Sequence, residues 1–146
     1  MPIKGVKRVR ERLKQELKEI TDRKTHDVLW RVGLVAGGFA ANMTPIDTGF
    51  LINSQFQYIG DTPEGMQLRL GYTARYAEWV HDMPGTLKGR PREHFGKTRE
   101  GVEFGGGTGK GDYWDPNAEP EFLRKAFEEP DNADDIYKTI IEGYKT

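Results

Sequence analysis

The chain has 146 residues, a length typical of a single domain, and its 22 basic and 23 acidic side chains give a formal net charge of −1. It contains no cysteine, which excludes disulfides, thiolate metal sites and thiol catalysis. No apolar run approaches the roughly 20 residues that cross a bilayer. We therefore expect one domain over residues 1–146, made in the cytoplasm, with a modest core and no membrane partner.

The first predicted element is one long helix, from about residue 4 to residue 43. Apolar side chains recur there at steps of three and four residues, which is the spacing of one helix face. They are Val6, Val9, Leu13, Leu17, Ile20, Val28, Leu29, Val32, Val35, Ala36, Phe39 and Met43. Lys24 interrupts the pattern, so a kink near residues 23–27 stays open. Pro45 ends the helix, because the residue before a proline is disfavoured in the α region.

An antiparallel hairpin is predicted next, over about residues 50–71. A turn at residues 45–49 precedes it, since Pro, Asp, Thr and Gly all favour turns. The first strand is expected to run from Phe50 to Gly60, with Ile52, Phe56 and Tyr58 at roughly alternating positions. Apolar residues alternate with polar ones again over 66–70, beyond a loop at 60–65.

The remaining predicted elements are helices. A short one is expected over about residues 73–81, and two C-terminal ones over about 119–129 and 132–144, with Pro130 stopping the first of them. Between them, residues 84–112 are predicted to form a flexible loop. The sequence therefore predicts an α+β fold, in which a long N-terminal helix packs on a small antiparallel sheet.

The predicted loop over residues 84–112 is long and rich in glycine. It holds nine of the 18 glycines, and connections of this length are usually functional or disordered. A solvated loop, a segment that orders against neighbouring subunits, and passive contact with DNA all stay open. The residues proposed for an inter-subunit contact are Lys88, Arg90, Arg92, Phe95, Arg99 and Phe104.

Charge is distributed unevenly along the chain. Residues 4–24 carry nine basic and four acidic side chains, whereas residues 112–146 carry ten acidic and four basic ones. Two solvated helix faces would explain this pattern. Complementary surfaces on identical subunits that bind head to tail would explain it as well, and such contacts can close a ring.

The sequence offers little for catalysis or for cofactor binding. The glycine-rich run at 105–111 lacks both the first glycine and the hydroxyl residue of a phosphate-binding P-loop. His26, His81 and His94 are not spaced as a metal site, so we interpret them as surface residues or helix C-terminal partners. We expect no catalytic residue, no cofactor and no metal.

Three short motifs, in this order, resemble the tail-completion or head–tail joining (minor tail component) family of long-tailed, siphovirus-type bacteriophages. The first is Thr44-Pro45-Ile46-Asp47-Thr48-Gly49-Phe50-Leu51-Ile52-Asn53-Ser54, after the long helix. The second is Tyr76-Ala77-Glu78-Trp79-Val80, and the third is Glu119-Pro120-Glu121-Phe122-Leu123-Arg124-Lys125-Ala126-Phe127. The residues that carry the resemblance are Pro45, Asp47, Thr48, Gly49, Tyr76, Ala77, Trp79, Pro120, Phe122, Leu123 and Ala126.

This resemblance implies a virion structural protein without catalytic residues, made in the host bacterial cytoplasm. Its copies would form a ring, commonly six-fold, at the junction between neck and tail. Its partners would be a connector or neck protein on one side and a tail terminator or tail tube protein on the other. Tyr76, Trp79, Phe122 and Phe127 would mainly support the core.

Two further interpretations stay open. The chain would also suit a tail terminator or another minor tail protein. A different class, a small nucleic-acid-binding accessory protein, would use the basic first helix, although near-neutral net charge is unusual for it.

Overall fold

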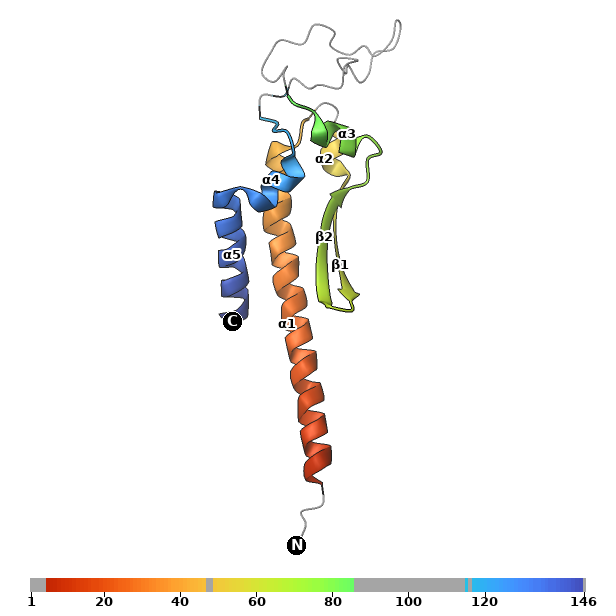
Figure 1. Cartoon of the computed structure of the whole chain (residues 1–146), viewed down its shortest axis with the longest axis vertical. Helices are drawn as coiled ribbons and strands as arrows, with labels where there is room; N and C mark the ends of the chain where they lie inside the picture. The colour runs from red at the N-terminus through yellow and green to blue at the C-terminus, as the bar shows by residue number, and fades with distance from the viewer. Residues whose placement is uncertain (1–4, 47–48, 86–114, 116, 146) are drawn as a thin grey trace, which may run out of the picture.

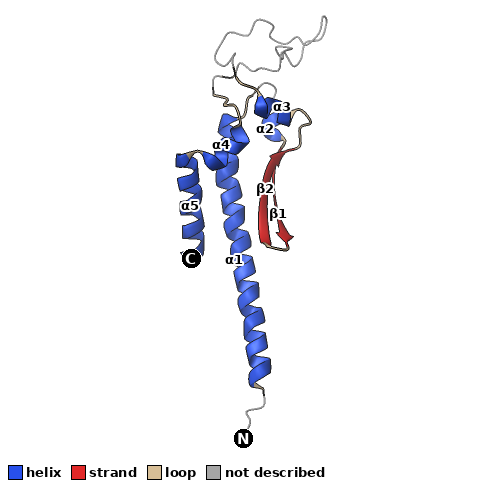
Figure 2. Ribbon diagram, viewed as in Figure 1, coloured by secondary structure: helices blue, strands red, loops and turns tan. Residues whose placement is uncertain are grey.

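The computed structural model describes residues 5–46, 49–85, 115 and 117–145. It has the α+β architecture that the sequence predicts: a long N-terminal helix, a two-stranded antiparallel sheet and C-terminal helices (Figures 1 and 2). The hairpin and the C-terminal helix lie beside the upper half of the long helix, whose lower half extends beyond them (Figure 1). The proposed loop residues Lys88, Arg90, Arg92, Phe95, Arg99 and Phe104 lie outside the described residues, as do Asp47 and Thr48 of the first motif.

Helix α1 runs from Val6 to Met43 as one uninterrupted element of 38 residues. At 1.5 Å per residue it is about 57 Å long. Lys24 breaks the apolar pattern without ending the helix, because a single half-exposed charge does not disturb the backbone hydrogen bonds. Thr44 takes an extended conformation before the buried Pro45 and ends the helix where the sequence predicts.

The hairpin begins later than the sequence predicts. Phe50–Asn53 forms a short helix, α2, so Ile52 does not belong to the strand. Gly49 has a left-handed φ of 81°, and its carbonyl accepts a hydrogen bond from the Asn53 N–H at 3.0 Å, which closes a helical turn. Strand β1 then spans Gln55–Thr62 and pairs with β2, Gly65–Tyr72.

The face of the hairpin that packs on α1 is partly polar. Gln55 pairs with Tyr72 in the strand register, Gln57 with Leu70, and these side chains are half-buried. Phe56 and Tyr58 occupy the opposite face and are 42% and 58% exposed. The strand prediction was therefore right in type, but the aromatic residues that motivated it point away from α1.

Two glycines of α1 allow this close packing. A Cβ on Gly33 would collide with the Gln57 amide and lie 3.1 Å from the Leu68 side chain. A Cβ on Gly37 would lie 3.1 Å from the Gln55 Oε1 atom. A side chain at either position would separate the helix from the sheet. The close packing that glycine allows therefore compensates for its low helix propensity.

The other helices differ from the prediction mainly at their ends. Helix α3 spans Ala77–Asp82 and α4 spans Phe122–Glu128, both starting later than predicted. Helix α5 spans Pro130–Lys145, so Pro130 starts this helix instead of standing before it. Proline suits the first turn of a helix, because its missing N–H would have no partner there.

The core lies where α1 ends and where the hairpin, α3 and α4 meet. Leu51, Ala74 and Phe122 are its buried centre. Val28, Val32, Ala36 and Ala40 extend the buried surface down α1. In the described part of the chain, none of the helices combines the length and apolarity needed to span a bilayer.

Candidate functional site

The three sequence motifs come together around the core at the upper end of the molecule. Ala77 of the second motif and Leu123 of the third both pack against the Leu51–Ala74–Phe122 cluster. The Glu119 N–H donates to the Met43 carbonyl at 2.9 Å, which ties the third motif to the end of α1. Ala126 is fully buried, and Pro45 and Pro120 are buried and half-buried. The motif residues that the structure describes therefore mostly build the fold.

The prediction that Tyr76, Trp79 and Phe127 support the core is wrong. Trp79 is 78% exposed and Tyr76 is 42% exposed, although both belong to the second motif. Phe127 is 37% exposed on α4, whereas Phe122 of the same helix is 1% exposed. Helix α3 has only six residues and presents one face to the core, so its spacing pattern could not identify which face that is.

His81 links α3 to α4, a role that the sequence did not indicate. Its ring lies 5.1 Å from the Phe122 ring, and its Nε2 atom accepts a hydrogen bond from the Arg124 N–H at 3.4 Å. Its backbone carbonyl accepts one from the Glu121 N–H at 2.7 Å. Among the described residues no three His, Asp or Glu side chains are grouped to hold a metal ion, so the contacts give His81 a structural role.

A polar network joins α1 to the hairpin just below the core. The buried Thr44 hydroxyl donates to the Ala40 carbonyl at 2.6 Å and lies 2.7 Å from the Tyr72 hydroxyl. The Gln55 amide donates to that Tyr72 hydroxyl at 2.9 Å and to the Gly37 carbonyl at 3.0 Å. The sequence signal for this contact is two glutamines at alternate strand positions opposite two glycines one helical turn apart.

Stability at alkaline pH should depend on Tyr72. Burial raises the pKa of its phenol above the ordinary value of 10.0, while hydrogen bonds with Thr44 and Gln55 oppose the shift. The unfolded chain therefore loses this proton at lower pH than the folded one, so the contribution of Tyr72 to stability is constant below about pH 10 and is lost above it. We expect Tyr72→Phe to cost about 1 kcal/mol near neutral pH and to flatten the alkaline decline. Urea unfolding across a pH series measures both effects, and curves that stay parallel would contradict the prediction.

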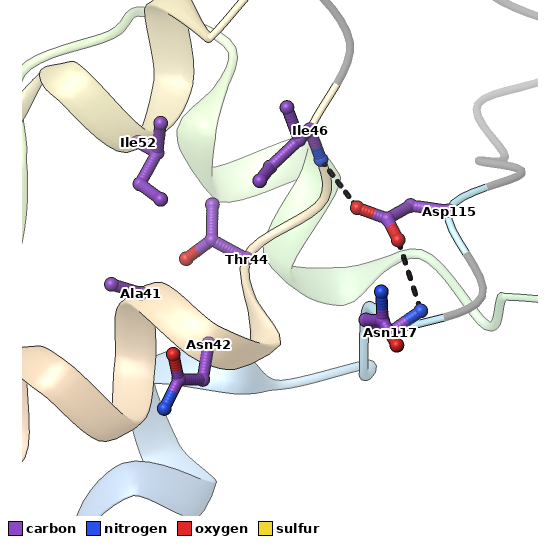
Figure 3. Close-up of a pocket in the computed structure, with 7 residues that line it drawn as sticks. All are labelled: Ala41, Asn42, Thr44, Ile46, Ile52, Asp115 and Asn117. Atoms are coloured by element: carbon purple, nitrogen blue, oxygen red, sulfur yellow. Dashed lines mark hydrogen bonds between the residues drawn. The ribbon is translucent and has the colours of Figure 1, made fainter.

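An open hollow lies beside the end of α1 (Figure 3). Its only described carboxylate, Asp115, accepts hydrogen bonds from the Ile46 and Asn117 N–H groups, each at 2.9 Å. Ala41 and Ile52 supply apolar lining. Both carboxylate oxygens of Asp115 already accept hydrogen bonds from backbone, so this side chain joins two chain segments. The described lining then holds no other charged group that could bind a ligand.

Two parts of the described surface are apolar. We call residues 6–24 of α1 the stem; its apolar residues, which we call the stem stripe, are Val6, Val9, Leu13, Leu17 and Ile20. These five side chains are 55–68% exposed, and every residue from 5 to 21 is exposed. A second apolar surface, the α5 flank, consists of Tyr137, Ile140, Ile141 and Tyr144, which are 36–64% exposed. Neither surface has a partner within the described part of the chain that buries it.

Comparison of the chain with known protein families, with curated proteins and with solved structures finds no match.

Proposed function

We propose that this chain is a structural subunit of a phage virion, and that its copies form a ring at the junction between head and tail. The observation that carries the proposal is the exposed stem stripe. The family resemblance of the three motifs, which suggests six copies, supports the position in the virion. In this role the protein acts by binding and needs no catalytic group.

Exposure of the stem stripe to water is unfavourable, so a partner that buries it would gain free energy. Each of its five side chains is more than half exposed, so burying them all would contribute about 1 kcal/mol each, or about 5 kcal/mol together. Association itself costs about 4–15 kcal/mol, so burial of the stem stripe alone gives weak binding, and the surface that it meets must add to it. A closed ring gives every subunit two contacts and closes the assembly, which suits a subunit that assembles on a growing virion.

The distribution of basic side chains favours protein assembly over reading of nucleic acid. Lys7 and Lys14 share one side of the stem, because they are two helical turns apart, whereas Arg8 and Arg12 lie together on another side. Arg12 is paired with Glu16 at 3.2 Å. A groove-binding helix instead gathers its basic residues on one face.

Electron microscopy of phage that lacks this gene tests the proposal. We expect negative-stain images of such lysates to contain DNA-filled heads and full-length tails that lie unjoined. Supplying the intact gene from a plasmid should restore joined virions and serves as the control. Absent or overlong tails would instead assign the chain to tail termination or tail building. Normal virions without the gene would overturn the structural role.

A further inference from the structure

The stem and the α5 flank are both exposed, and their positions on the chain relate them. Helix α5 packs along the upper part of α1, where Gly143 meets Val28 and the Tyr144 and Thr25 hydroxyls lie 2.9 Å apart. The stem begins where α5 ends and continues alone below it (Figure 1). The 19 residues of the stem would be about 28 Å long and the 16 residues of α5 about 24 Å. The stem stripe itself, from Val6 to Ile20, would be about 21 Å long and the α5 flank, from Tyr137 to Tyr144, about 10 Å. The flank is therefore long enough to cover about half of the stripe, and within one subunit the two surfaces do not meet.

Their charges are opposite. The stem carries eight basic and four acidic side chains, whereas α5 carries four acidic and two basic ones. Arg10 lies at the edge of the stem stripe, four residues after Val6 and three before Leu13, and Asp134 lies three residues before Tyr137 on the α5 flank. Within the described residues neither Arg10 nor Asp134 has an ion-pair partner.

Pairing of two stems is disfavoured. Their like charges would repel. The stem stripe also advances by three, four, four and three residues from Val6 to Ile20. These steps depart from the strict alternation of three and four that an ordinary two-stranded coiled coil uses.

We propose that the stem stripe of one copy binds the α5 flank of a second copy, in a head-to-tail contact made by apolar side chains and bordered by basic residues on the stem and acidic residues on α5. This inference rests on the proposed ring and names the surfaces that would build it. Because the stem and the flank are different surfaces, each subunit can bind one neighbour with its stem and a second neighbour with its flank. The same contact therefore repeats from copy to copy.

Mixing two variants tests the contact. Leu13→Glu/Leu17→Glu disables the stem, and Tyr137→Glu/Ile141→Glu disables the flank; all four positions are exposed, so both proteins should fold. By sedimentation velocity at tens of micromolar, we expect the unaltered chain to form oligomers and each variant alone to be monomeric, with the junction weakened roughly 100-fold or more. An equimolar mixture should form dimers and nothing larger, because one intact stem meets one intact flank. Circular dichroism checks folding. Where a pair fails it, Arg10→Glu and Asp134→Lys take its place; each alone should assemble more weakly, and their mixture should assemble like the unaltered chain, because every junction in it again joins opposite charges.

A matched control separates the stem stripe from net charge. Arg8→Glu changes the charge by the same two units as the stem variant but lies on another side of the helix, and it should assemble like the unaltered chain. A monomeric Arg8→Glu protein, a flank variant that still assembles, a mixture that stays monomeric or an unaltered chain without self-association would each overturn the contact. None of these results decides the head–tail role, which the microscopy of the gene deletion tests separately.

Discussion

Replacing Phe122 by alanine is expected to lower the free energy of unfolding by about 3–5 kcal/mol. Phe122 is 1% exposed at the centre of the core, and its ring packs edge-on against Tyr72, with centroids 5.3 Å apart. It also contacts His81 and so holds α4 against both α3 and the hairpin. Truncation removes these contacts and leaves a cavity that three elements border, which limits how far the structure can collapse into it.

Phe127→Ala is the matched control for this prediction. It removes the same side chain from the same helix, but Phe127 is 37% exposed, so the expected loss is smaller. Thermal and urea unfolding of both variants measure the difference, and Phe122→Ala should lower Tm by on the order of 10 °C. Equal losses would mean that the core does not have Phe122 at its centre.

Replacing Gly33 by leucine should separate the hairpin from α1. The new side chain would collide with Gln57 and Leu68, which already fill the space beside the helix backbone. We expect a cost of about 1–3 kcal/mol from overpacking, or more if β1 and β2 detach. The gain in helix propensity over glycine, about 1 kcal/mol, offsets part of this cost.

Gly38→Leu isolates the propensity effect. Gly38 is in the same helix, and nothing lies within 4 Å of a Cβ placed on it, so this variant should be slightly more stable than the unaltered chain. Because both variants gain the same helix propensity, urea unfolding should rank Gly33→Leu about 1–3 kcal/mol below Gly38→Leu. Equal stability of the two variants would show that the sheet does not pack on the Gly33 face of α1.

The long helix and the hairpin could be predicted because their signals are local. Apolar residues at steps of three and four identified α1 to within two residues of its start, and Pro45 identified its end. Alternation over Met66, Leu68 and Leu70 identified β2. The helical turn at Phe50–Asn53 was missed because it follows a left-handed conformation at Gly49. Glycine permits this conformation, but its presence in a sequence does not predict it.

Apart from α2, the sequence by itself determined which elements form and which residues could bury an apolar face, because helix and strand periods are properties of neighbouring residues. It did not determine which apolar faces stay exposed. The stem stripe and the buried residues of α1 belong to one helix, yet only the tertiary structure decides that the hairpin, α4 and α5 cover its upper half. Likewise, Tyr76 and Trp79 fit a core pattern but remain exposed, and Gln55 and Gln57 face inward. The physical reason is that burial depends on which elements meet in space, and that choice is made by contacts between residues far apart along the chain.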